Sequence, residues 1–198
     1  MTANEIIARA EELVEESYAT ATWLAWIRAV LEDLTPLAKI FKETEVTLTI
    51  ASNEATVNLA AITDFFELVN VSIKPTGKRR MKLRKLPAYD GASQGWVRYD
   101  TTVKLQNLTV TAGKAVVEYY AKLALTASGT DYTLNLPADY HDIVVKGVCA
   151  LAMQKEEEFD RKQDFYGEYT LGKRRIYAER LVAMEPWNAS AMRGGGAQ

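Results

Sequence analysis

The spacing of apolar residues changes twice along this chain of 198 residues, and this limits the possible fold more than any other feature. Residues 6–34 repeat at helical spacing, residues 45–125 include runs that alternate every second residue, and residues 139–184 return to helical spacing. A period near 3.6 residues is typical of amphipathic helices, and a period of two is typical of strands with one buried face. The chain is therefore predicted to be α+β, with a β-rich insert between two helical regions.

Two helices are predicted at the N-terminal end. Thr2 and Glu5 have the spacing of a capping box, in which each side chain binds a free backbone N–H at the helix start. A second helix is expected over residues 21–34, with Trp23 in a wide apolar face. Pro36 is expected to end this helix, because proline has no backbone N–H to donate.

The insert is predicted to consist of strands. Residues 46–50 and 55–59 alternate on either side of a short polar stretch, which predicts a β-hairpin. A third strand is expected over residues 65–73, and residues 115–125 give the clearest alternation in the chain. The stretch between them, residues 75–107, reads as a long variable region.

A buried helix followed by a long charged helix is predicted near the C-terminal end. The buried helix should open at Pro137, because proline suits the first helical turn. The charged helix should run over residues 156–184, where Gly167 and Gly172 are expected to bend or divide it. The last residues, 186–198, are too polar and glycine-rich to order themselves, which predicts a flexible tail.

Together these elements predict three parts. Residues 1–44 and 132–185 should form one helical bundle domain, residues 45–131 the β-rich insert, and residues 186–198 the C-terminal tail.

Composition excludes several classes of protein. The net charge of −2 argues against a dedicated nucleic-acid binder, which is usually strongly basic. One cysteine and one histidine allow neither an internal disulfide nor a Cys/His zinc site. A run of about 18 apolar residues would be needed to span a membrane, and the chain contains none. With no cationic start before an apolar stretch, a soluble protein made in the cytoplasm is expected.

No residue pattern predicts catalysis, a metal or a cofactor. His141 adjoins Asp142, but neighbouring helical residues point about 100° apart, so Asp142 is poorly placed to orient the imidazole. His141 is therefore expected to be a helix-capping or interface residue and not a general base. Cys149 is expected to be a small buried hydrophobe. Glu156, Glu157 and Glu158 should fan around a solvated helix start, whereas a hard cation needs converging oxygens.

Seven cations and no acid lie between residues 74 and 85: Lys74, Lys78, Arg79, Arg80, Lys82, Arg84 and Lys85. If this stretch is extended, Arg80, Lys82 and Arg84 share one face. That face is a candidate contact for the DNA backbone, which attracts charge without sequence preference, or for an acidic patch on a neighbouring subunit. A solvated surface is the simpler alternative.

The C-terminal end holds the second candidate interaction site. It comprises Lys173, Arg174, Arg175, Tyr177, Trp187 and Met192. Aromatic residues anchor many interfaces, so a tryptophan in a polar tail indicates a partner pocket. A solubilising terminus is the alternative.

Several stretches resemble the head-to-tail adaptor (connector) proteins of tailed bacteriophages. Trp23-Leu24-Ala25-Trp26-Ile27-Arg28-Ala29 is similar to an early helix of that family, with Arg28 where asparagine is usual. The other matching stretches are residues 84–96, residues 117–123 and the Leu136-Pro137 to Tyr140-His141 turn. The resemblance covers residues 20–185.

The resemblance implies a structural, non-enzymatic protein of the virion neck. Such proteins form a ring, often a dodecamer, under the portal protein, extend the channel for genomic DNA, and provide the attachment site for a stopper or tail protein. Residues 173–177 and the tail would then be candidates for portal binding. The residues alone leave two alternatives open: a tail-completion or baseplate protein, and a nucleic-acid-binding accessory protein that uses residues 74–85.

Overall fold

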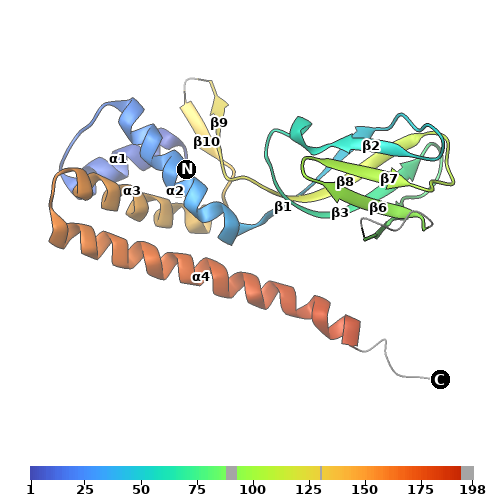
Figure 1. Cartoon of the computed structure of the whole chain (residues 1–198). Coiled ribbons are helices and arrows are strands. Elements are labelled where there is room, and N and C mark those ends of the chain that lie inside the picture. Colours follow the sequence, from blue (N-terminus) through green and yellow to red (C-terminus); the bar gives the residue numbers. More distant parts are fainter. Residues whose placement is uncertain (88–92, 130, 193–198) are drawn as a thin grey trace. The chain divides into compact units, whose positions relative to one another are not determined.

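The computed structural model of the chain describes residues 1–87, 93–129 and 131–192, with side chains as far as Arg180. Within these residues it is a mixed α+β structure with four α-helices and several small sheets, which confirms the predicted class (Figure 1). The chain divides into two compact units. Met1–Lys39 with Leu123–Gln198 is called the helical unit, and Ile40–Lys122 the sandwich unit.

The helical unit is organised around its third helix. The α-helices are α1 (Ala3–Val14), α2 (Thr20–Ala38), α3 (His141–Lys155) and α4 (Phe159–Met192). Helix α3 contacts each of the other three, and most of its side chains are buried, as its apolar sequence predicted. A small hairpin of β9 (Leu125–Ser128) and β10 (Asp131–Leu134) precedes α3 and lies against the start of α1. No helix in the described part of the chain is long and apolar enough to cross a membrane.

The ends of the first two helices test the predicted signals. Thr2 and Glu5 form the predicted capping box. Pro36, however, does not end α2, which continues to Ala38. A proline in the last turn removes only one backbone hydrogen bond, and the Arg180 side chain donates to the carbonyls of Pro36 and Leu37.

Two glycines mark close helix packing. A Cβ on Gly147 would lie 3.0 Å from Tyr169 and from both Val30 methyl groups, and a Cβ on Gly172 would lie 2.6 Å from Ile143. The expected break at Gly172 is absent, because α4 continues as one helix through this residue. The glycine instead lets α4 lie close to Ile143 of α3. The residues expected to form a flexible tail are helical as far as Met192, and residues 193–198 lie outside the described part.

The sandwich unit contains two four-stranded sheets. The first has the order β1-β8-β3-β4, formed by β1 (Ile40–Thr47), β8 (Gly113–Ala121), β3 (Phe65–Pro75) and β4 (Met81–Lys82). The second has the order β2-β7-β6-β5, formed by β2 (Ala55–Asn58), β7 (Thr102–Gln106), β6 (Gly95–Tyr99) and β5 (Arg84–Lys85). Alternate residues of both sheets, among them Val57, Val103, Val71 and Val117, meet in one core.

The predicted strands exist, but one predicted pairing is wrong. The predicted turn is present, because Ala51 and Glu54 exchange two backbone hydrogen bonds of 2.9 Å. The pairing does not continue into a hairpin of the two strands, because β1 pairs with β8 and β2 pairs with β7 in the other sheet. The third predicted strand is β3, which carries two irregularities in its pairing with β8, at Phe66 and at Val69. The supposed variable region contains four short strands, β4 to β7.

Candidate functional site

The only histidine holds a turn together. The Nε2 atom of His141 lies 2.8 Å from the Leu136 carbonyl oxygen, and a carbonyl can only accept, so Nε2 donates. Its Nδ1 atom then accepts from the Met1 ammonium group at 2.9 Å. The ring is buried and both of its nitrogens are occupied. This geometry gives His141 a structural role at the start of α3.

Cys149 lies among the buried side chains of α3. Burial raises the pKa of its thiol to about 12, so the thiolate that a nucleophile or metal ligand requires is not populated near neutral pH.

The carboxylates expected at the start of the charged helix lie in the turn before it. Glu156 accepts a hydrogen bond from the Tyr18 hydroxyl, at 2.7 Å, and Glu158 pairs with Arg161. Burial, followed by the hydrogen bond to Glu156, raises the pKa of Tyr18 above its ordinary value. Among the described residues, no group of three or more acidic, histidine or cysteine side chains is arranged to hold a metal.

An aromatic cluster fixes this turn against the start of α2. The rings of Tyr18, Trp23 and Trp26 meet edge to face, with centroids 5.1–5.2 Å apart. Lys155 places its ammonium 4.2 Å from the centre of the Tyr18 ring. The turn between α3 and α4 is therefore anchored to Tyr18 by a hydrogen bond and a cation–π contact, and edge-to-face ring contacts hold Tyr18 to α2.

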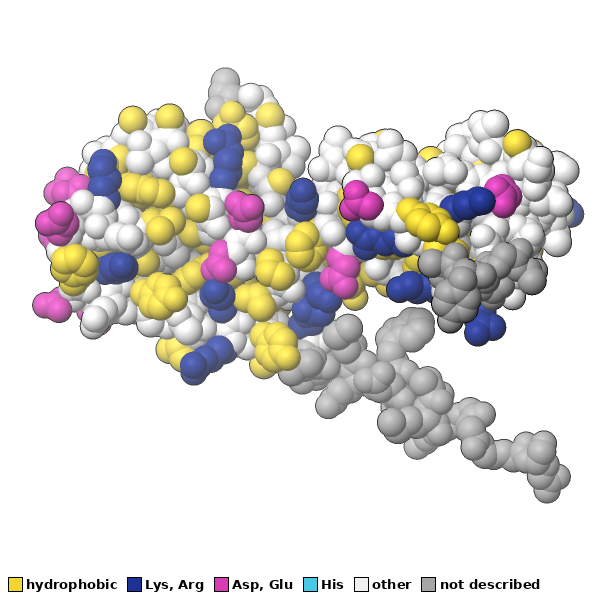
Figure 2. Space-filling model, in the orientation of Figure 1, with side chains coloured by type: hydrophobic (Ala, Val, Ile, Leu, Met, Phe, Trp, Pro, Cys, Tyr) yellow, Lys and Arg dark blue, Asp and Glu magenta, His cyan; other side chains and the backbone are white. Residues whose placement is uncertain are grey.

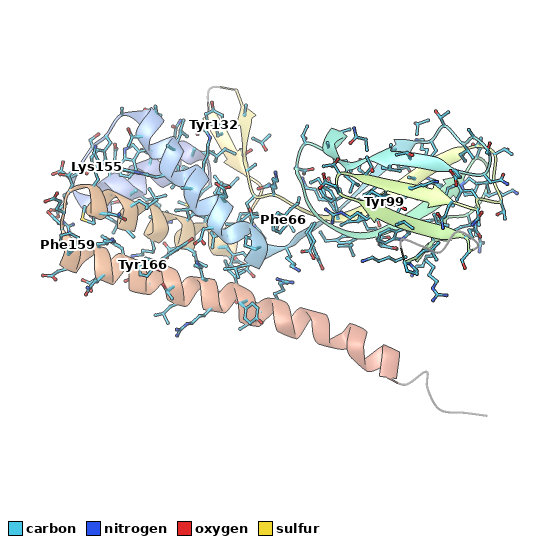
Figure 3. All side chains as sticks on the ribbon, viewed as in Figure 1. Phe66, Tyr99, Tyr132, Lys155, Phe159 and Tyr166 are labelled. Atoms are coloured by element: carbon cyan, nitrogen blue, oxygen red, sulfur yellow. The ribbon has the colours of Figure 1, made fainter. Side chains whose placement is uncertain are left out.

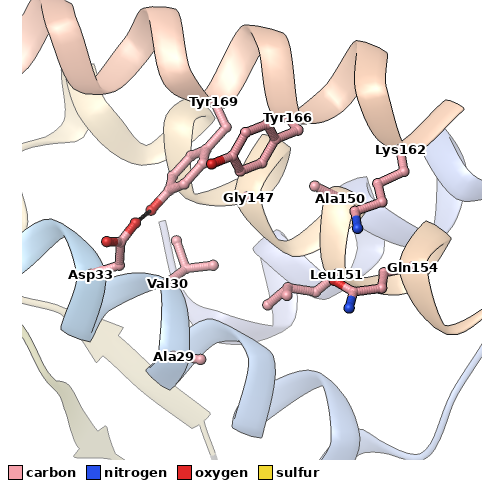
Figure 4. Close-up of a pocket in the computed structure, with 10 residues that line it drawn as sticks. All are labelled: Ala29, Val30, Asp33, Gly147, Ala150, Leu151, Gln154, Lys162, Tyr166 and Tyr169. Atoms are coloured by element: carbon pink, nitrogen blue, oxygen red, sulfur yellow. Dashed lines mark hydrogen bonds between the residues drawn. The ribbon is translucent and has the colours of Figure 1, made fainter. Parts of the chain in front are cut away.

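The cations predicted as a site on α4 fall into two groups. Lys173 donates to Asp33 of α2 at 2.7 Å. Tyr169 donates to the same carboxylate at 2.6 Å, and Figure 4 shows this second bond. Burial alone would raise the pKa of Asp33, but these two hydrogen bonds and the Lys173 charge lower it below its ordinary value. Lys173 thus holds α4 to α2, and Arg175 pairs with Glu179 on its own helix.

Arg174 and Tyr177 are the members of that site whose side chains are exposed and have no hydrogen-bond or ion-pair partner in the described part of the chain. The side chains of Trp187 and Met192, also predicted as part of the site, lie outside the described residues.

Exposed aromatic side chains continue along α4. Phe159, Tyr166 and Tyr177 are 63%, 57% and 51% exposed, and the first two are labelled in Figure 3. They are separated by seven and eleven residues, close to two and three helical turns, so they share one side of the helix over about 27 Å. We call these three residues the aromatic ridge. The sequence signal for it is this spacing.

A groove of about 480 Å³ lies beside the ridge, between α2, α3 and α4. Small and apolar residues form most of its wall, including Val30, Gly147, Ala150 and Leu151, and Tyr166 and Tyr169 stand at its edge (Figure 4). The aromatic ridge and this groove leave exposed apolar surface along α4, and surface of this kind is suited to protein contact.

The predicted basic face is divided between the two sheets of the sandwich unit. Lys82 lies in β4 of the first sheet, and Arg84 lies in β5 of the second. Arg80 is bound within the chain, with ion pairs to Glu43 and Glu118 and a hydrogen bond from its Nε atom to the Ser72 hydroxyl. The structure therefore does not bring Arg80, Lys82 and Arg84 together as one free face.

Arg80 belongs to a charge network on the outer face of the first sheet. Glu43 of β1 lies directly opposite Glu118 of β8, a like-charge pair that would repel, and Arg80 bridges the two. Lys74 and Lys114 are opposed in the same way, and Glu45 bridges them at 2.7 and 2.8 Å. We call these six residues the neutralised network. Sequence reasoning missed it, because the strand register that creates it was unknown.

Comparison with known proteins gives one family. The family model described as "SU10 adaptor protein" matches residues 1–193. No curated protein matches the chain.

Proposed function

Since this chain belongs to the SU10 adaptor protein family of bacteriophage head-to-tail adaptors, and is on that basis a structural component of the virion, we propose that it forms a ring under the portal protein. The ring, of twelve copies, extends the channel through which genomic DNA passes without sequence-specific binding. Its other side provides the attachment site for a stopper or tail protein. The protein is non-enzymatic and occupies the neck, at the junction of head and tail.

The observation that carries this proposal is the family match over nearly the whole chain. The local geometry supports it, because His141 and Cys149 both serve packing or hydrogen bonding inside the helical unit. A structural subunit instead needs extended exposed surfaces, which the aromatic ridge supplies.

For portal binding we favour α4. Of the residues first considered, Arg174 and Tyr177 are exposed and available, and Arg175 is exposed but paired. Lys173 has a positioning role, since its bond to Asp33 fixes the helix that carries the others. Trp187 and Met192 follow on the same helix and complete the proposed surface.

A tail-completion or baseplate protein is the second candidate, since such a protein would also need exposed aromatic surfaces. A nucleic-acid-binding accessory protein is less favoured, because Arg80, the centre of the predicted basic face, is neutralised by two carboxylates.

The test is the light-scattering mass of the protein mixed with rings of its cognate portal protein. Wild type should form a complex of defined mass, and a chain ending at Glu185 or carrying Arg174→Glu with Tyr177→Ala should lose at least 90% of it. Asp164→Ala, an exposed change elsewhere on α4, is the matched control and should bind as wild type. Failure of wild type to associate at any ratio would refute the adaptor proposal.

A further inference from the structure

Charge is unequally divided between the two units. The sandwich unit carries 12 Lys and Arg against 8 Asp and Glu, a net of +4, and the helical unit carries 12 against 18, a net of −6. The net charge of −2 for the whole chain hides this difference. Opposite surfaces on one polypeptide suit contact between copies, because every copy then brings both halves of the interface.

Five of the twelve cations of the sandwich unit are ion-paired in the described part of the chain. Lys42, Lys74, Arg80, Lys104 and Lys114 each lie within ion-pair distance of a carboxylate. Two of the other seven have contacts of another kind: Arg98 donates to the Asp100 carbonyl oxygen and lies over the Phe65 ring, and Lys122 also has a partner within the chain. The remaining five lie in one stretch, which we call the basic strap: Lys78, Arg79, Lys82, Arg84 and Lys85. None of the five forms an ion pair with a carboxylate of the described residues, and all five are exposed. Lys85 also lies over the ring of Trp96.

The strap is held in a defined conformation. Lys82 pairs with Ser72 in the first sheet, Arg84 pairs with Gly95 in the second, and Leu83 between them is buried in the core. A Cβ on Gly95 would lie 2.6 Å from the Leu86 side chain, so only glycine lets the strap close against β6. Because the backbone that carries these cations is already fixed, binding has to order only their side chains, which suits a docking surface.

The matching carboxylates lie where α1 ends and α3 turns into α4. Five of them are exposed and have no hydrogen-bond or ion-pair partner in the part of the chain that the structure describes: Glu12, Glu15, Glu16, Glu157 and Asp160. Arg161 donates to the Leu13 carbonyl, which brings the two segments together. We call these five residues the acidic end, and Figure 2 shows Asp and Glu gathered at this end of the helical unit.

Three carboxylates of the acidic end lie where they are unfavourable for α1, whereas Asp160 lies in the first turn of α4, where the helix dipole favours a carboxylate. Glu12, Glu15 and Glu16 lie at the C-terminal end of α1, where the helix dipole is negative and no basic residue is present in the last turn. Such carboxylates destabilise the isolated unit, and a cationic partner would reverse the effect.

We infer that the basic strap of one copy binds the acidic end of a second copy. The contact joins two different surfaces, so it can repeat from copy to copy and close into a ring. This inference rests on the proposed ring and names the surfaces that hold its subunits together. A DNA contact by the strap would leave the acidic end without a partner.

Charge reversal tests the pairing directly. Lys82→Glu with Arg84→Glu reverses the strap, and Glu12→Lys with Glu16→Lys reverses the acidic end without touching the left-handed residues Glu15 and Glu157. Sedimentation equilibrium of the full chain at low and high salt should show self-association of wild type that salt weakens. Each reversed variant should lose at least tenfold in association constant, and the chain with all four changes should recover it.

Two controls keep the test decisive. Arg28→Glu, an exposed reversal in the helical unit, should associate as wild type, and circular dichroism should show all variants folded. Wild type that does not self-associate at millimolar concentration, or a fourfold variant that does not recover, overturns the inference. So does a strap reversal that spares self-association and abolishes binding to short duplex DNA. The adaptor proposal stands or falls separately, on portal binding.

Discussion

The neutralised network and the basic strap both belong to the sandwich unit, and they differ in the state of their Lys and Arg side chains. In the network, each like-charge pair across the strands is bridged by a third, opposite charge. In the strap, five cations are left without a carboxylate among the described residues. The comparison separates cations that hold the fold from cations that are available to a partner, a distinction that charge counting along the sequence cannot make.

The largest effect is expected where the strap meets the sheet. Gly95→Ala places a Cβ against Leu86 and the Arg84 carbonyl oxygen, which cannot move without separating β5 from β6. Overpacking of this kind costs about 1–3 kcal/mol of unfolding free energy. Urea denaturation measures it, and Gly167→Ala, with open space around the new Cβ in α4, should leave stability unchanged or raised. Equal stability of Gly95→Ala and wild type would mean that the strap is not closed against β6.

Removing the bridge in the network should have the next effect. Arg80→Met leaves Glu43 and Glu118 opposite each other with no cation between them. Because these groups are partly exposed, the expected loss is about 1 kcal/mol. Hydrogen exchange of the β8 amides reports it. A variant as stable as wild type would contradict the bridging role.

The second bridge predicts a pH dependence. Hydrogen bonds from Lys114 and Lys74 lower the pKa of Glu45 to about 2, against an ordinary value of 4.5. Because the folded carboxyl has the lower pKa, its contribution to stability is complete above 4.5 and is lost as the pH falls toward 2. Protection of β8 should therefore fall more steeply with acid in wild type than in Glu45→Gln, and parallel curves would refute this.

The strap itself should contribute least to stability. Lys82→Ala with Arg84→Ala removes two exposed cations that have no ion pair in the described structure. The change in unfolding free energy should stay within about 0.5 kcal/mol. A loss as large as that of Arg80→Met would show that the strap also serves the fold, and the distinction between the two regions would disappear.

Local signals predicted the elements better than their partners. The capping box at Thr2 and the alternation that became β8 depend on residues close in sequence, and both were found. The strands of two residues, β4 and β5, are too short to show any period, so the sequence predicted only a long variable region there. The network arises from register between distant strands, as in Glu43 opposite Glu118. Gly172 was interpreted as a helix breaker. Its actual role, close packing against Ile143, could not be predicted because Ile143 lies on another helix.

For the candidate site, the sequence identified the charged stretches but not which of their side chains are ion-paired within the chain. Lys173 and Arg80 stood out for the same reason as Arg174 and Arg84, yet the first two are bound within the chain. The bound cations differ from the available ones only in lying near Asp33, Glu43 or Glu118, and these positions follow from tertiary structure.

The central claim is that this chain is a structural adaptor at the junction of head and tail. Electron cryo-microscopy of virions that carry a small folded tag on this chain tests it most directly. The account predicts extra density in a ring at the neck, directly below the portal. Tag density at the distal end of the tail, or its absence from complete virions, would contradict the account.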